Sequence, residues 1–174
     1  PDGSALTFVQ RQGLLRLPDP GYQRRPFHPR MGAFGISYLE YGASLQDSTR
    51  RTWAVRHRLH RDPETGAPEP LVYYVDRAAP EPVRSALVEG ASWWEEAFAA
   101  AGHPGLFRVE IAPEDLDPLD ARHNVIQWVH RSTRGWSYGN AVTDPRTGEI
   151  VKGHVSLGSL RVRQDRLLFE GLLG

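Results

Sequence analysis

Cysteine is absent from this sequence of 174 residues, and so is any long apolar run. The lack of cysteine excludes disulfide bonds, a thiol nucleophile and every zinc site built from cysteine ligands. No segment approaches the roughly 20 consecutive apolar residues that a membrane-spanning helix needs. Lysine is nearly absent too, since Lys152 is the only one. The formal net charge is zero, so bulk electrostatics give no reason to expect a nucleic-acid or membrane partner.

The common catalytic signatures are also missing. The sequence contains no glycine-rich phosphate loop ending in Gly-Lys-Ser or Gly-Lys-Thr, no serine in a nucleophile elbow and no HExxH. His57 and His60 lie in a strand-like stretch, where their spacing does not make a ligand pair. The odd spacing of His123 and His130 sends their side chains to opposite faces of a regular strand. We therefore interpret these residues and His154 as structural or surface side chains, and expect no catalytic residue and no metal ligand in this chain.

Charge is segregated along the chain. Residues 1–61 carry ten arginines and four acidic residues, whereas residues 62–121 carry three arginines and thirteen acidic residues. The remainder carries eight basic and four acidic residues. Two interpretations are open: the basic segment docks on the acidic middle of its own chain, or it binds an external polyanion. The second lacks the aromatic interleaving and clustered lysines typical of such segments, so we favour the first.

Two regions are expected, and the Pro-rich stretch 61–70 separates them. The first region, residues 1–61, is predicted to be an Arg-rich extended arm, with a short hairpin within residues 6–17 and a strand over residues 52–59. The second region, residues 62–174, has regular periodicity. Residues 71–75, 107–111 and 124–130 predict strands, because β-favouring side chains fill them or alternate with polar ones.

Helix and turn signals complete the second region. One apolar helical face is formed by side chains that recur every three or four residues: Val83, Leu87, Ala91, Trp94, Phe98 and Ala101. Gly102 is expected to end this long helix. The Asp-Pro-Arg-Thr-Gly sequence at 144–148 predicts a hairpin turn between residues 136–143 and 149–157. Ser159 can cap a last helix that begins at Leu160.

Several blocks of sequence carry a family resemblance: residues 73–82, 90–98, 124–139 and 144–161. Residues 126–139, Ile-Gln-Trp-Val-His-Arg-Ser-Thr-Arg-Gly-Trp-Ser-Tyr-Gly, form a long and unusual run, whereas the turn at 144–150 is of a common type. Residues 71–157 resemble the N-terminal half of metzincin zinc-protease domains. More narrowly, they resemble a large bacterial family of zinc-dependent metalloproteases, and residues 27–32 and 57–59 resemble the arm that precedes such a domain.

The resemblance implies a fold and an activity for a longer protein. It implies an α+β fold, in which a twisted mixed sheet of about four to five strands is backed by a long helix, as in a zincin N-terminal subdomain. In such peptidases a HExxH helix holds zinc, and its Glu activates the water that hydrolyses the peptide bond. That motif is expected beyond Leu173, so residues 62–174 would be a truncated catalytic domain. This chain is therefore expected to be inactive alone and to need no cofactor itself, while the full-length protein would bind zinc. A secreted or periplasmic location is suggested by the resemblance only.

One functional element of the family falls within the chain. Metzincin sheets have an edge strand antiparallel to the others, and an extended substrate adds to it through main-chain hydrogen bonds. By order along the chain, the corresponding residues are Trp136, Tyr138, Gly139, Asn140, Ala141 and Val142. The alternative is an ordinary hairpin arm whose open edge is covered by its own chain.

Two other functions are also compatible with the sequence. The same edge could serve a non-catalytic module that binds peptides, or the chain could be a structural scaffold whose arm only covers the acidic middle. The expected partner of the full-length protein is an extended peptide or protein substrate. Without an active-site helix, one face of the sheet would stay partly uncovered, and this apolar surface could drive self-association.

Overall fold

The computed structural model describes residues 7–62, 64–67, 69–132 and 135–173. They form a six-stranded sheet, a separate two-stranded sheet and several helices. The elements in chain order are the 3-10 helix η1 (Pro29–Met31), β1 (Gly35–Leu39), β2 (Arg50–Ala54), β3 (Arg56–His57), β4 (Leu71–Val75), α1 (Val83–Ser92), α2 (Trp94–Ala100), β5 (Phe107–Ile111), β6 (Asn124–Val129), β7 (Tyr138–Thr143), β8 (Glu149–Gly158) and α3 (Leu160–Leu173).

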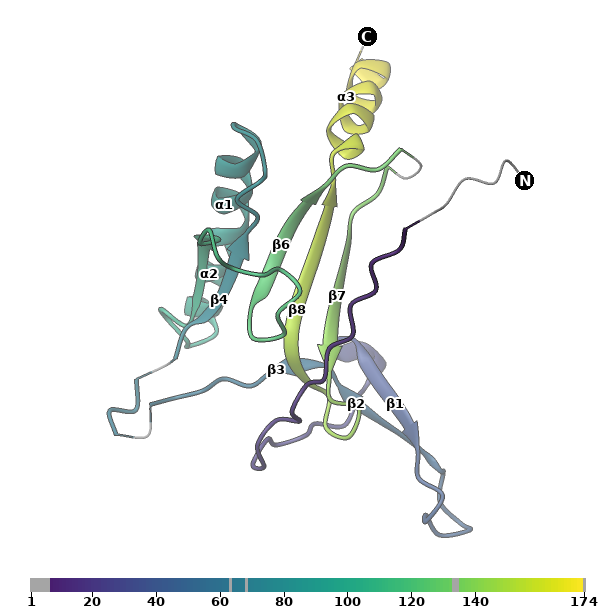
Figure 1. Cartoon of the computed structure of the whole chain (residues 1–174). Coiled ribbons are helices and arrows are strands. Elements are labelled where there is room, and N and C mark those ends of the chain that lie inside the picture. The colour runs from purple at the N-terminus through teal and green to yellow at the C-terminus, as the bar shows by residue number, and fades with distance from the viewer. Residues whose placement is uncertain (1–6, 63, 68, 133–134, 174) are drawn as a thin grey trace, which may run out of the picture.

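The larger sheet has the strand order β3-β8-β6-β4-β5. Strand β7 lies off this path and pairs with β8 on the side away from β6 (Figure 1). Every pairing along the path is parallel, whereas β7 runs antiparallel to β8. Among the described residues, β7 is therefore an edge strand and the sheet's one antiparallel member. This mixed sheet with few helices agrees with the expected α+β class. It has one strand more than the expected four to five, because the arm contributes β3.

Helices α1 and α2 pack against β4 and β5 and cover that end of one sheet face (Figure 1). The prediction of a single long helix is wrong in one respect, because the chain forms two helices that are separated at Trp93. Gly90 and Ser92, just before the break, have low helix propensity, which the apolar periodicity does not reveal. Gly102 has a φ of +86° and follows the end of α2, as the sequence predicted.

Two expectations for the arm are wrong. The strand expected over residues 52–59 is divided at Val55, because β2 pairs with β1 in the small sheet and β3 pairs with β8 in the large one. The hairpin expected within residues 6–17 does not form in the described part, residues 7–17, where the leucines stay exposed; Leu6 lies outside the described residues. The arm's hairpin is instead the β1–β2 pair.

The hairpin of β7 and β8 has the turn that the sequence predicted. The N–H groups of Thr147 and Gly148 donate to the carbonyl of Asp144. Gly148 has a φ of +81°, and a Cβ there would collide with the carbonyl of Ala54, so the turn needs glycine for conformation and for space. The arm therefore lies directly against the turn.

The C-terminal helix α3 continues from the end of β8 and points away from the sheet, at the end opposite the β1–β2 hairpin (Figure 1). Its apolar side chains stay exposed, including Leu167, Phe169 and Leu172. The core lies instead around the parallel strands, where Val75, Leu106 and Val125 are almost fully buried. In the part of the chain that the structure describes, no helix is both long and apolar enough to span a membrane.

Candidate functional site

The residues expected to bind an extended peptide lie together along the open side of β7. Tyr138, Gly139, Asn140, Ala141 and Val142 belong to this strand, and Trp136 precedes it by two residues. Tyr138 is 45% exposed and Val142 47% exposed, so apolar side chains as well as the strand edge face solvent. The structure therefore places five residues of the predicted set on one exposed edge strand and Trp136 just before it.

The register of the hairpin determines which main-chain groups of β7 point outward. The N–H of Asp144 donates to the carbonyl of Glu149 at 2.9 Å, so the main-chain groups of Asp144 face β8. Such groups alternate between the two sides along a strand. The register shifts between Val142 and Thr143, but the extra residue lies in β8, so the alternation along β7 continues unbroken. Every second residue of β7, counted back from Asp144, therefore faces β8.

The intervening residues, Gly139, Ala141 and Thr143, present their main-chain groups to the open edge. The N–H of Ala141 donates to the side chain of the preceding residue, with 2.8 Å between the nitrogen and Asn140 Oδ1. That bond is consistent with an N–H that points away from β8. The edge therefore offers alternating donors and acceptors at the spacing that a further strand requires.

Arg131 holds the aromatic residues at the start of β7. Its guanidinium lies 4.9 Å from the ring centroid of Tyr138 and donates to that residue's hydroxyl at 3.2 Å. It also donates to the carbonyl of Trp136 at 3.4 Å. Ser137 Oγ accepts from the N–H of Gly158 at 3.1 Å, which ties this segment to the end of β8. The start of the edge strand is thus positioned by side chains as well as by the hairpin.

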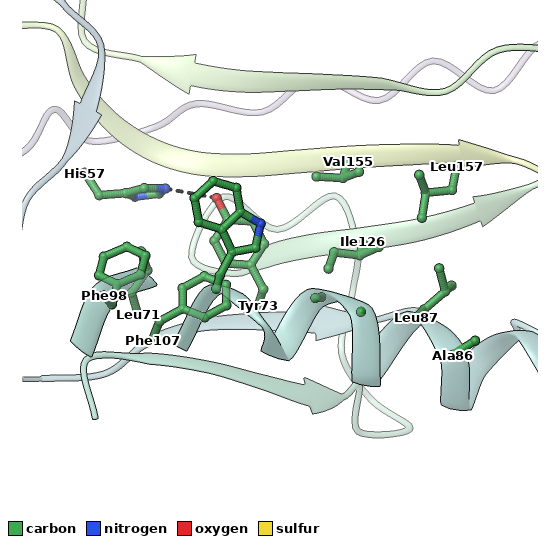
Figure 2. Close-up of a pocket in the computed structure, with 13 residues that line it drawn as sticks. His57, Leu71, Tyr73, Ala86, Leu87, Phe98, Phe107, Ile126, Val155 and Leu157 are labelled. Carbon is green, nitrogen blue, oxygen red and sulfur yellow. Dashed lines mark hydrogen bonds between the residues drawn. The ribbon is translucent and has the colours of Figure 1, made fainter. Parts of the chain in front are cut away.

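A large apolar cavity of about 530 Å³ lies between the helices and the sheet (Figure 2). It is lined by His57, Leu71, Tyr73, Ala86, Leu87, Gly90, Ala91, Trp94, Phe98, Phe107, Ile126, Val155 and Leu157. Its main polar contact joins His57 Nε2 and the Tyr73 hydroxyl at 3.0 Å. Burial lowers the pKa of His57 to about 4 and raises the pKa of Tyr73. Both groups are therefore neutral at pH 7, and the cavity favours apolar contacts.

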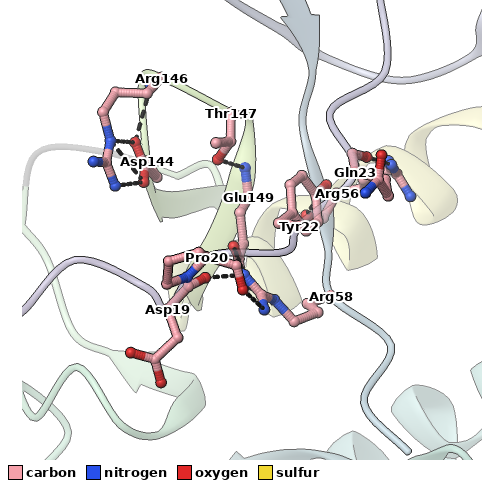
Figure 3. Close-up of polar contacts among 10 residues, drawn as sticks. All are labelled: Asp19, Pro20, Tyr22, Gln23, Arg56, Arg58, Asp144, Arg146, Thr147 and Glu149. Carbon is pink, nitrogen blue, oxygen red and sulfur yellow. Dashed lines mark hydrogen bonds and ion pairs between the residues drawn. The ribbon is translucent and has the colours of Figure 1, made fainter.

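The arm meets the hairpin in a polar cluster (Figure 3). Arg58 forms two parallel 2.8 Å bonds to the carboxylate of Glu149, which hold the pKa of the guanidinium above its usual value. Arg58 also donates to the carbonyl of Asp19 at 2.7 Å. The ring of Tyr22 lies under the guanidinium groups of Arg56 and Arg58, 5.0 and 5.6 Å from its centroid. These contacts join three distant segments of the chain.

This arrangement only partly matches the expected docking of the arm on the acidic middle. Arg11 pairs with Asp117 of that region, as expected. Arg58, however, pairs with Glu149, which lies beyond it. The sequence pattern could not identify this partner, because the pair joins β8 to a residue 91 positions earlier.

The remaining histidines do not converge on one point. Three of them each contact a different side chain. His123 packs edge-on against Tyr74, His130 Nδ1 lies 2.8 Å from Ser159 Oγ, and His154 Nε2 lies 3.2 Å from Ser156 Oγ. Over the described ranges, no group of three or more His, Asp or Glu side chains could hold a metal ion. No step of a reaction is therefore assigned to a metal held by these residues.

We predict that the chain self-associates through the apolar cavity and the exposed Trp94 of α2 that lines it. Trp94 lines the cavity, and its neighbour Trp93 is equally exposed but does not line it. We expect Trp94→Glu to weaken self-association roughly tenfold or more, because it places a charge in the apolar contact. Trp93→Glu is the matched control and should have little effect. Sedimentation equilibrium measures both, and equal effects of the two changes would contradict the prediction.

Comparison with known proteins gives one partial match. Residues 1–62 match the family model of a domain of unknown function (DUF5117). No curated protein and no solved structure matches the chain.

Proposed function

We propose that this chain provides the sheet and the substrate-binding edge of a metzincin-like zinc peptidase, and that an extended peptide pairs with β7. The complete protein would hydrolyse peptide bonds with zinc-activated water. The observation that carries the proposal is the position of β7, an exposed antiparallel edge strand on an otherwise parallel sheet. The resemblance of residues 71–157 to the N-terminal half of such domains implies a strand of this kind at this place in the chain.

The chemistry of the edge supports peptide binding. The outward main-chain groups of Gly139 and Ala141 can pair with a peptide of any sequence, which gives affinity without specificity. Tyr138 and Val142 flank them with exposed apolar side chains. No residue of Tyr138–Thr143 is charged or proline, so the strand lacks the side chains that usually block edge pairing.

We do not assign zinc ligands to this chain. The described residues do not offer a fitting set of ligands. The role proposed for this chain is therefore limited to binding and aligning the peptide. Chemistry at the scissile bond would belong to residues beyond Gly174.

A proline at Gly139 tests the edge directly. The N–H of Gly139 points outward, and no atom of the described residues lies within 4 Å of a Cβ added there. Gly139→Pro should therefore remove one outward donor while leaving every bond to β8 in place. We expect peptide affinity to fall roughly tenfold, from the lost hydrogen bond and the bulk of the ring. Fluorescence anisotropy with labelled, uncharged, proline-free dodecapeptides measures this loss.

Gly139→Ala is the matched control, because it adds a Cβ but keeps the N–H. It should bind the peptides as the unmodified chain does. Equal affinities for the alanine and proline variants, with both folded by circular dichroism, would rule out pairing at this edge.

A non-catalytic peptide-binding module is the second candidate, because the same exposed edge would serve it equally well. Peptide binding to the isolated chain does not separate the two functions. Zinc content and peptide cleavage by a protein extended beyond Gly174 do. A longer protein that binds peptides, contains no zinc and cleaves nothing would favour the second candidate.

A further inference from the structure

The side chain of Asn140 occupies the middle of the proposed peptide-binding edge. Asn140 is exposed, and its own main-chain groups face β8. Its Oδ1 accepts the N–H of Ala141 at 2.8 Å, which is an outward-pointing donor. The side chain therefore satisfies a main-chain group that an added strand would otherwise use.

This contact matters because the other side chains of β7 offer its edge little protection. Natural edge strands are usually protected by lysine, proline, an inward charge or a covering segment. Of these, β7 itself carries neither charge nor proline, and the register shift beside Val142 lies at its far end. The Asn140 carboxamide therefore caps an outward N–H near the centre of a strand that carries no charge.

We propose that Asn140 acts as a gate on β7. Its carboxamide occupies the N–H of Ala141 until an incoming peptide strand displaces it. The proposal rests on the proposed function, in which β7 pairs with a peptide. Displacement exchanges the bond from Ala141 to Asn140 Oδ1 for a bond from Ala141 to a peptide carbonyl. The freed carboxamide then returns to water. The gate thus lowers the affinity of β7 for a peptide strand.

Amide hydrogen exchange of the peptide-free chain tests the closed gate. Asn140→Ala removes the acceptor and adds no bulky apolar side chain. We expect the Ala141 amide, corrected for its intrinsic rate, to exchange roughly fivefold faster in this variant, which corresponds to the loss of one ordinary hydrogen bond. The Gly139 amide, which no described side chain caps, should not change. Unchanged exchange at Ala141 would overturn the proposal.

Peptide affinity tests the competition. With the uncharged dodecapeptides, Asn140→Ala should bind about two- to fivefold more tightly, because no carboxamide has to be displaced. Asn140→Asp should bind more weakly than the unmodified chain by a similar factor at neutral pH, because a carboxylate is the stronger acceptor for the Ala141 N–H. The opposite signs distinguish a gate from a general change in surface character.

The outcomes also distinguish failure of the gate from failure of the proposed peptide binding at β7. If the peptides bind but all Asn140 variants bind equally, the gate is wrong and the edge function stands. If neither the unmodified chain nor any variant binds a peptide, the edge function fails and the gate fails with it.

Discussion

Replacement of Arg58 by methionine is expected to lower the free energy of unfolding by roughly 3–5 kcal/mol. The Glu149 side chain is only 7% exposed, and Arg58 supplies both of its 2.8 Å guanidinium bonds. Methionine keeps most of the volume of the arginine stem but leaves the carboxylate buried without its charge partner. Urea denaturation followed by tryptophan fluorescence measures the change.

The expected loss has a second component. Arg58 also donates to the carbonyl of Asp19 and lies over the ring of Tyr22, so its removal loosens the start of the arm where it crosses the hairpin (Figure 3). Faster proteolysis within residues 7–22 of the variant is therefore expected alongside the lower stability. The Arg58–Glu149 ion pair thus links the arm to the hairpin, in addition to the pairing of β3 with β8.

The double variant Arg58→Met with Glu149→Leu is the control. Replacement of a buried ion pair by apolar residues of similar volume is often nearly neutral, because both desolvation penalties disappear together. We expect the double variant to recover most of the stability lost in the single one. A single variant as stable as the unmodified chain, or a double variant no better than the single, would contradict this account.

Acidification should destabilise the fold through His57 before the carboxylates titrate. Burial lowers the pKa of His57 to about 4, below its usual value of 6.5. The unfolded chain therefore binds the proton first, and stability is lost as the pH falls from the unfolded value towards the folded one. Between about pH 7 and about pH 5 the loss from this residue is about 2 kcal/mol.

His57→Phe isolates this effect. Phenylalanine keeps an aromatic ring against Tyr73 and cannot be protonated. It does lose the 3.0 Å hydrogen bond to the Tyr73 hydroxyl, so its stability at neutral pH is not the test. The test is the pH dependence. Between about pH 7 and about pH 5, the variant should lose less unfolding free energy than the unmodified chain does, by most of the roughly 2 kcal/mol that His57 contributes. An unchanged slope would show that the histidine is not protected from protons by burial.

Much of the fold could be predicted because the signals are local. The alternation at Phe107–Ile111 and the apolar run at Leu71–Val75 each predicted a strand that is present. The turn at 144–148 predicted the hairpin, and the helical period from Val83 predicted the apolar face that lines the cavity. The candidate site was identified differently, because the position of β7 at an edge was implied only by the family resemblance.

The errors arose where the partner of a segment decides its structure. Residues 52–59 alternate like one strand, yet the chain changes sheets at Val55 because β3 pairs with β8. The Arg58–Glu149 and His57–Tyr73 pairs also join residues far apart in the chain, and no spacing rule predicts them. The interruption at Trp93 depends on weak helix formers just before it, which the apolar pattern does not reveal.

The sequence by itself determined most strands and helices of residues 71–174, because burial of one face imposes a period of two on strands and of 3.6 on helices. It also excluded thiol chemistry and a HExxH site within these residues. Only the tertiary structure decided which strands pair, that β7 stays open on one side, and that Asn140 caps an outward N–H there. The physical reason is that main-chain pairing and register are settled between segments distant in sequence, so the properties of an edge belong to the assembled sheet.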